Sequence, residues 1–133
     1  MLLSLNIKEW MMSDNNEDKR LEYFKKVQEQ TPDDYRKQYT QTIIGGVIVG
    51  GMTPYEAYLA GGQFAYQVSA DNEVWPAGSD PMRVMWMQTH QPDNSEIIMM
   101  FNNSTQYKSK EPIPFRAIVD KGLVIHIEKQ SNE

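Results

Sequence analysis

Histidine and cysteine, two residue types that often bind metals or act in catalysis, are scarce in this 133-residue chain. The sequence contains two histidines, His90 and His126, and no cysteine, which excludes disulfides and thiolate-bound metals. His126 and Glu128 are two residues apart on a predicted strand, so they share a face and could supply two metal ligands. No third ligand is evident, and His126 alternates with apolar isoleucines, as a solvent-facing residue does. We therefore predict no metal, no cofactor and no catalytic residue.

The motifs of nucleotide-binding and hydrolytic enzymes are missing as well. The glycine-rich stretch "GGVIVGG" lacks the lysine of a phosphate-binding loop, and no G-x-S-x-G or H-E-x-x-H pattern occurs. The formal net charge is −5, and Arg83 is the only lysine or arginine between Gln38 and Tyr107. Such a surface repels phosphate, so we predict no nucleic-acid partner. The apolar run at 43–51 is about ten residues too short to span a bilayer, so we predict no transmembrane segment.

The residues with the greatest binding potential are apolar and lie in the segments "RVMWMQTH" and "EIIMMFN", both predicted as strands. In each segment large apolar side chains occupy both faces, although a sheet covered on one side should be polar on the other. Monomers rarely leave a large apolar patch in water, so we predict that something outside the helical layer covers the second face. The predicted partner-binding residues are Val84, Met85, Trp86, Met87, Ile98 and Met100.

Three covers for this second face are compatible with the sequence: the apolar N-terminal segment Met1–Met12, a second copy of the chain, or a different protein. We favour a homodimer, because two-fold homodimers are the commonest closed oligomers. The alternative is a strongly twisted sheet that hides both faces within one monomer.

A first helix is predicted by Leu21, Phe24 and Val27, which recur at helical spacing after the polar stretch "SDNNED". The stretch "TPDD" at 31–34 predicts a second helix, with threonine as the N-cap and proline at the first helical position. The apolar residues that follow it are spaced four apart, so they would share one face of that helix.

The stretch "GGMTPYEAYLAGG" predicts a third, short helix between two glycine pairs. Thr53 can act as its N-cap, and Glu56 can reach back to complete a capping box. The second glycine pair, at 61–62, can supply the left-handed stop. The helix has only about seven residues, so packing must stabilise it.

From residue 63 onward the periodicity changes to alternation. Short, turn-rich connections favour an antiparallel meander, and the stretch "DKG" at 120–122 is typical of a tight hairpin. Helices followed by strands indicate an α+β fold, with two to three N-terminal helices packed on an antiparallel β-meander sheet. The predicted strands are "FAYQVS", "RVMWMQTH", "EIIMMFN", "PFRAIVD" and "LVIHIEK". Residues 1–133 are predicted to form a single domain, with an N-terminal extension at 1–15, a helical layer at 16–62 and the sheet at 63–129.

The segment "IIGGVIVGGMTPYEAYLAGG" resembles the hallmark of the SmpA/OmlA (BamE-like) family of small bacterial lipoprotein domains, which has a β-lactamase-inhibitor-like fold. In that family an isoleucine-bearing helix leads to a G-M-T turn and a short helix that ends in glycine. The segment "FRAIVDKGLVIHI" is similar to the hairpin that ends the family's three-stranded sheet. The matching residues are Ile44, Gly46, Val47, Gly50–Thr53, Glu56, Leu59 and Gly61. Family members bind other proteins and envelope components without catalysis, so the resemblance implies a periplasmic or outer-membrane-associated protein.

Two functions are compatible with these patterns. The first is a non-enzymatic protein-binding or scaffold module, which the resemblance supports. The second is a small-molecule-binding or enzymatic α+β cone of the cystatin-like kind, with an apolar pocket that Tyr66, Trp86, Met99 and Asp71 could line. A cavity of several hundred cubic ångströms between helices and sheet would favour the second function. The compartment stays open, because the lack of a secretory signal favours the cytoplasm and the resemblance favours the envelope.

Overall fold

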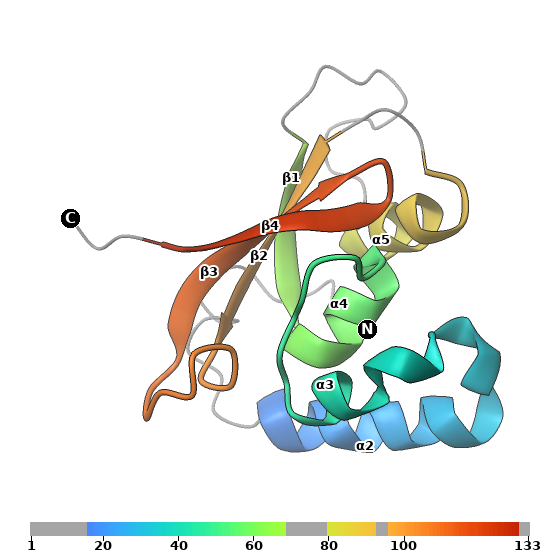
Figure 1. Cartoon of the computed structure of the whole chain (residues 1–133), viewed down its shortest axis with the longest axis horizontal. Coiled ribbons are helices and arrows are strands. Elements are labelled where there is room, and N and C mark those ends of the chain that lie inside the picture. Colours follow the sequence, from blue (N-terminus) through green and yellow to red (C-terminus); the bar gives the residue numbers. More distant parts are fainter. Residues whose placement is uncertain (1–15, 69–79, 93–95, 131–133) are drawn as a thin grey trace.

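A four-stranded antiparallel sheet carries its helices on one face (Figure 1). The computed structural model describes residues 16–68, 80–92 and 96–130. The arrangement confirms the predicted α+β fold, in which N-terminal helices pack on a meander with strand order β1-β2-β3-β4. The described elements are α2 (Asn16–Gln30), η2 (Pro32–Asp34), η3 (Lys37–Tyr39), α3 (Thr40–Ile44), α4 (Pro54–Gly61), β1 (Phe64–Val68), α5 (Pro81–His90), β2 (Glu96–Asn103), β3 (Ile113–Asp120) and β4 (Leu123–Lys129).

The core lies between the sheet and the helices that cover it. Along β2, Ile97, Met99 and Phe101 belong to this core and are at most 3% exposed. Phe101 pairs with Phe64 on β1 and with Phe115 on β3, and its ring stacks on Phe115 with centroids 5.4 Å apart. Burial of these aromatic and aliphatic side chains supplies the main favourable free energy of packing.

The connection between β3 and β4 is the tight hairpin that the sequence predicted. Asp120 pairs with Leu123 across a two-residue loop. The loop residues Lys121 and Gly122 have φ angles of 53° and 81°, as a type I′ turn requires. A Cβ atom at Gly122 would also lie 2.7 Å from Cβ of Pro92. Both the turn and the close contact therefore favour glycine at this position.

The segment 83–90 is helical, so its prediction as a strand was wrong. α5 begins at Pro81, and the carboxylate of its N-cap Asp80 accepts the Met82 N–H at 2.8 Å. The buried residues of this helix are spaced as on one helical face: Val84, Met85 and Gln88. The described part of the region 63–129 therefore contains a helix as well as four strands. Of the two segments with apolar side chains on both predicted faces, only β2 is a strand. In α5 the apolar side chains are instead distributed around a helix.

The predicted second helix is divided into two 3₁₀ turns and the five-residue α3. Thr31 forms no capping hydrogen bond, and Tyr35 is extended, with φ −138° and ψ 159°. This extended backbone lets Tyr35 pack its ring edge-on against Phe24 of α2, with centroids 5.0 Å apart. It also directs the Arg36 N–H to a carboxylate oxygen of Glu56, 2.7 Å away. Tertiary contacts thus override the local helix signal.

α4 has the predicted capping box. Thr53 Oγ1 accepts the Glu56 N–H at 3.2 Å, and the Glu56 carboxylate accepts the Thr53 N–H at 3.0 Å. The two glycines at the helix end serve different purposes. Gly62 has a φ of 85°, whereas a Cβ atom at Gly61 would lie 2.6 Å from the Phe101 ring. Gly62 therefore turns the chain into β1, and Gly61 lets α4 approach the sheet closely.

Replacing Thr53 with alanine is expected to lower the free energy of unfolding by about 1 kcal/mol, because the capping hydrogen bond to the Glu56 N–H is lost. Thr53→Ser keeps the hydroxyl and should retain most of the stability. Urea denaturation of the two variants and the wild type measures the difference. Equal midpoints for Thr53→Ala and the wild type would show that the cap contributes nothing.

Candidate functional site

The six residues predicted to bind a partner do not form one surface. Val84 and Met85 are 1% and 3% exposed and belong to the core beneath α5. Trp86, in contrast, is 42% exposed on the outer side of the same helix, and Met87 is half-buried beside it. The remaining two, Ile98 and Met100, alternate along β2 with the core-facing residues and so lie on the sheet face away from the helices. Of the six, Trp86 is the side chain best placed to contact a partner.

Among the described residues, the void between α5 and the sheet is too small for the interior pocket of the cystatin-like alternative. The void there measures about 10 Å³, which is room for one water molecule at most. Tyr66 and Met99 line this void, whereas Trp86 lies outside it. Asp71, the carboxylate predicted for the pocket, lies outside the described residues. The void that the described residues form between this helix and the sheet therefore has no room for a ligand.

The two histidines are placed apart, on α5 and β4. His126 Nε2 lies 3.2 Å from a carboxylate oxygen of Glu128, and Glu128 also pairs with Arg116 on β3. This neighbouring guanidinium competes with any cation for the carboxylate. In residues 16–68, 80–92 and 96–130, no three His, Cys, Asp or Glu side chains are grouped as a metal site would need.

A continuous set of ring contacts crosses three helices, and we call its five residues the aromatic row: Tyr23, Tyr58, Tyr55, Trp86 and His90. Tyr23 on α2 contacts Tyr58 on α4 edge-on, with ring centroids 5.8 Å apart. Tyr55 lies 6.4 Å from Tyr58 and 5.2 Å from Trp86 on α5. The row ends with Trp86 and His90, whose centroids are 4.2 Å apart. Each ring is thus held in place by its neighbours.

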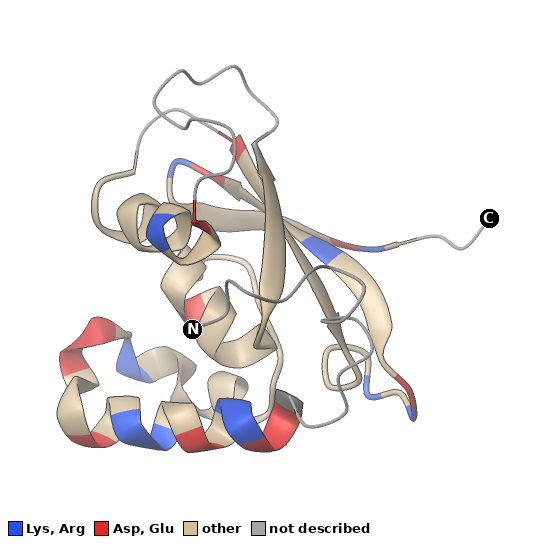
Figure 2. Ribbon diagram, turned by 180° about the vertical axis from the view of Figure 1, so that it is seen from behind, with Lys and Arg blue, Asp and Glu red and all other residues tan. Residues whose placement is uncertain are grey.

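The aromatic row is buried in its middle and exposed near both ends. Tyr55 is 3% exposed, whereas Tyr23 and Trp86 are 40% and 42% exposed. The hydroxyls of Tyr23 and Tyr55 lie 3.5 Å apart. Figure 2 shows that charged residues are frequent on α2 and scarce on α4 and α5, so the middle and far end of the row lie on weakly charged helices.

The tyrosine hydroxyls of the row are poor candidates for acid–base catalysis. Burial raises the pKa of Tyr58 to about 12. Burial also raises the pKa of Tyr55, and the hydrogen bond with Tyr23 raises it further. Both hydroxyls therefore stay protonated at neutral pH, where they can form hydrogen bonds but cannot act as bases.

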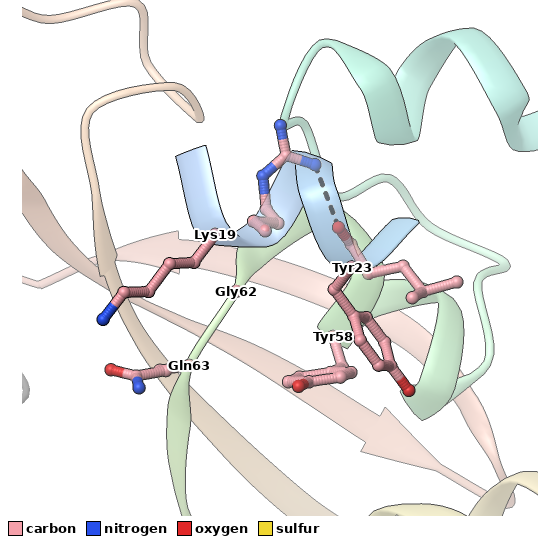
Figure 3. A pocket seen from close by; sticks show the side chains of 7 residues that line it. Lys19, Tyr23, Tyr58, Gly62 and Gln63 are labelled. Atoms are coloured by element: carbon pink, nitrogen blue, oxygen red, sulfur yellow. Dashed lines mark hydrogen bonds between the residues drawn. The ribbon is translucent and has the colours of Figure 1, made fainter. Parts of the chain in front are cut away.

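A pocket of about 200 Å³ opens beside the Tyr23 end of the row (Figure 3), and we call it the Lys19 pocket. The rings of Tyr23 and Tyr58 line one side of it, and the side chains of Lys19 and Gln63 lie on the other. Its full lining is Lys19, Arg20, Tyr23, Tyr58, Leu59, Gly62 and Gln63. The pocket thus combines aromatic walls with one ammonium group and one amide.

Arg20 joins the elements around this pocket, and sequence reasoning missed it. Its side chain is 4% exposed and pairs with Glu17 one turn earlier on α2. It also donates to the carbonyl oxygens of Ile43 and Ile44 at the end of α3 and of Leu59 near the end of α4. The guanidinium therefore ties α2 to the C-terminal ends of two other helices.

The comparisons with known proteins add no relative: no family model, curated protein or solved structure matches the chain. The similarity to the SmpA/OmlA family therefore stays a prediction from the sequence. Across the parts of the chain that are described, no helix has the length and apolar character needed to cross a bilayer.

Proposed function

We propose that this protein is a non-enzymatic protein-binding module and that the aromatic row is its contact surface. The observation that carries the proposal is the pair of exposed aromatic side chains, Tyr23 and Trp86, held by ring contacts on the helical side of the molecule. Tryptophan and tyrosine are the residue types most enriched among residues that dominate binding energy in protein interfaces.

The preorganisation of these rings favours binding. Tyr23 packs on Tyr58 and Trp86 packs on Tyr55, so little rotamer freedom remains to be lost when a partner docks. The half-buried Met87 lies next to Trp86 in the chain and can adapt its shape to different apolar surfaces.

The small-molecule alternative is less well supported by the same geometry. A cone that encloses a ligand needs a cavity between helices and sheet, and the void beneath α5 is only about 10 Å³. The buried carboxylate Glu56 is bound to Arg36 and to the Thr53 backbone, so it is engaged in the fold rather than presented to a ligand.

The proposal is tested with a displayed peptide library selected on the wild-type protein. We expect the selected peptides to bind Trp86→Ala at least tenfold more weakly, because truncating a central aromatic anchor costs roughly 2 kcal/mol or more. Ile125→Ala is the matched control, since Ile125 is 56% exposed on β4, away from the row. Peptides that bind Trp86→Ala and Tyr23→Ala as tightly as the wild type would contradict the proposal.

The partner that binds the aromatic row could also be a second copy of the chain, as in the predicted homodimer. Sedimentation velocity at micromolar concentration would detect it, and we expect Trp86→Glu to weaken any self-association while the Ile125→Ala control leaves it unchanged. A dimer that is unaffected by Trp86→Glu would place the interface elsewhere and contradict the row as the surface for self-association.

A further inference from the structure

The edge of the sheet at β4 is only partly occupied within the described structure. The Val124 carbonyl oxygen accepts the Gly51 N–H at 2.8 Å, and the Val124 N–H donates to the Met52 carbonyl oxygen at 2.8 Å. These two bonds place residues 51–52 at the position of a further strand beside β4. Figures 1 and 2 show that β4 continues past this point and that its C-terminal end extends away from the helices. The remaining part of the edge is therefore open to another chain.

Two residues of β4 direct their backbone groups outward along this free part of the edge. In an antiparallel strand, the N–H and C=O of one residue point to the same side, and successive residues alternate. The Gln130 N–H donates to the Pro114 carbonyl oxygen on β3 at 3.0 Å. Residue 128 therefore also faces β3, whereas Ile127 and Lys129 face away from it, where no described residue pairs with their backbone. Because unpaired N–H and C=O groups on an edge strand are a template for another strand, they select an extended chain as the occupant.

We propose that this free edge of β4 binds an extended segment of a partner protein, which adds as a strand antiparallel to β4. The backbone of the segment exchanges hydrogen bonds with Ile127 and Lys129. The described strand pairs of the sheet are all antiparallel, and antiparallel pairing is slightly more stable per residue. In such strand addition the main chain supplies affinity and alternate side chains supply specificity. The surface is separate from the aromatic row, which lies on the helices.

The side chains beside the outward-facing backbone groups specify the sequence of the segment. Lys129 is exposed, forms no ion pair within the described residues, and has its ammonium 5.0 Å from the ring centroid of Tyr107. A carboxylate directly opposite Lys129 would form a cross-strand ion pair. Ile127 and Tyr107 are partly buried against the core, so an apolar residue opposite Ile127 extends that packing. Because the strands are antiparallel, the segment carries an acidic residue and, two positions later, an apolar one.

A second copy of the chain fits this edge poorly. Antiparallel pairing of two β4 edges across a two-fold axis has to match outward-facing residues with one another. With the axis at Lys129 or at Glu128, two like charges lie directly opposite each other, which is destabilising. With the axis at Ile127, the end of the second copy's strand reaches the position that residues 51–52 already occupy. The edge therefore favours a different chain.

The probe for this proposal is an acetylated pentapeptide amide with the sequence Thr-Glu-Thr-Val-Thr, titrated into the full chain. Two-dimensional NMR and amide hydrogen exchange measure affinity and location together. We expect slower exchange of the Ile127 and Lys129 N–H groups, which become hydrogen-bonded, and no change at Glu128, whose N–H already faces β3. The peptide of reversed sequence should bind about tenfold more weakly, because both favourable cross-strand pairs are lost.

N-methylated peptides test the strand geometry directly. In the bound segment the glutamate and valine N–H groups face β4, and the N–H of the central threonine faces away. N-methylation of the valine removes a donor to the edge and should weaken binding about tenfold. N-methylation of the central threonine is the matched control and should leave the affinity almost unchanged.

Variants of the protein separate the backbone from the charge. Lys129→Pro removes one outward-facing N–H, and proline is tolerated on an edge strand at such a position, so we expect a folded protein that binds the probe about tenfold more weakly. Lys129→Gln keeps the N–H and should lose only the preference for glutamate over glutamine in the peptide. If Lys129→Pro does not fold, the two N-methylated peptides decide the question on the wild type.

The outcomes distinguish this inference from the proposed function. Equal affinity of the two N-methylated peptides, or unchanged exchange at Ile127 and Lys129, overturns the inference, even if peptides selected from a library still depend on Trp86. Self-association of the wild type that Lys129→Pro abolishes would show that a second copy occupies the edge, and would also overturn it. Trp86→Ala should bind the probe as tightly as the wild type does, so the strand site stands even if the aromatic row fails as a contact surface.

Discussion

Replacing Arg20 with alanine is expected to lower the free energy of unfolding by about 3–5 kcal/mol, the usual cost of breaking a buried charged network. The carbonyl oxygens of Ile44 and Leu59 lose a charged donor at helix ends, where few other donors are within reach. The Ile43 oxygen is less affected, because it still accepts the Gly46 N–H at 3.0 Å. Glu17, which is 42% exposed, can turn to water once its partner is gone.

Chemical denaturation with urea measures this loss, and Lys26→Ala is the control. Lys26 is exposed on the same helix, so its removal should change stability by no more than about 0.5 kcal/mol. Arg20→Lys should fall between alanine and the wild type, since an ammonium keeps the charge but cannot span three carbonyls as a planar guanidinium does. If Arg20→Ala unfolds at the same urea concentration as the wild type, the contacts of the Arg20 guanidinium contribute nothing to stability.

Local chemistry explains which parts of the fold were predictable from the sequence. The capping box of Thr53 and Glu56 and the hairpin at 120–122 depend on residues within one turn of each other, and both are present as predicted. The antiparallel pairing of β3 with β2 and with β4 followed from the short segments that join them, whereas β1 and β2 are separated by residues 69–95, which include α5. These features depend on little that lies outside the segment that encodes them.

The two errors in the predicted elements have different causes. The segment 83–90 alternates in a way that also fits one face of a helix, and the Asp-Pro start at residues 80–81 was the signal that could have decided it. The segment 31–44 has a helix start, but its backbone extends at Tyr35 because the ring packs on Phe24. The contact between Tyr35 and Phe24 cannot be foreseen from local propensity.

The candidate site was predictable only in part. Trp86 was named among the partner-binding residues, but for the wrong reason, as a strand residue. The other end of the row, Tyr23, lies on the outer part of an amphipathic helix, where no pattern distinguishes a binding residue from a solvated one. Arg20 shares a helical face with Phe24 and Val27 at spacings of four and seven, and this spacing could have indicated its burial, but not the carbonyls that it binds.

Replacing Arg36 with leucine is expected to lower the free energy of unfolding by about 3 kcal/mol at pH 7. Glu56 is 2% exposed, and its carboxylate accepts hydrogen bonds from the Arg36 side chain as well as from the backbone N–H groups of Arg36 and Thr53. Without the guanidinium this carboxylate is a buried charge with only backbone donors. The estimate lies at the low end for broken buried pairs, because Arg36 itself is 46% exposed and its attraction is screened.

The pH dependence of this loss gives the sharper test. Burial by itself raises the pKa of Glu56, but the hydrogen bonds from Arg36 and Thr53, with the charge of Arg36, together hold that pKa below its ordinary value of 4.5. In the wild type the carboxylate therefore contributes stability that is present above pH 4.5 and is lost as the pH falls through the lower folded pKa. In Arg36→Leu, burial dominates and the folded pKa rises, so that variant should gain stability relative to the wild type as the pH is lowered from 7 toward 4.

A double-mutant cycle with Glu56→Gln removes the charge that makes Arg36 necessary. In that background Arg36→Leu should cost much less than in the wild type, and its cost should no longer depend on pH, because a glutamine at position 56 does not titrate. Urea denaturation of the four proteins at pH 7 and pH 4 provides all the required free energies. The contrary outcome is a cost for Arg36→Leu that is the same at both pH values and in both backgrounds. Arg36 would then stabilise the fold through its contact with the Gly51 carbonyl and its packing on Tyr39, and not through the Glu56 carboxylate.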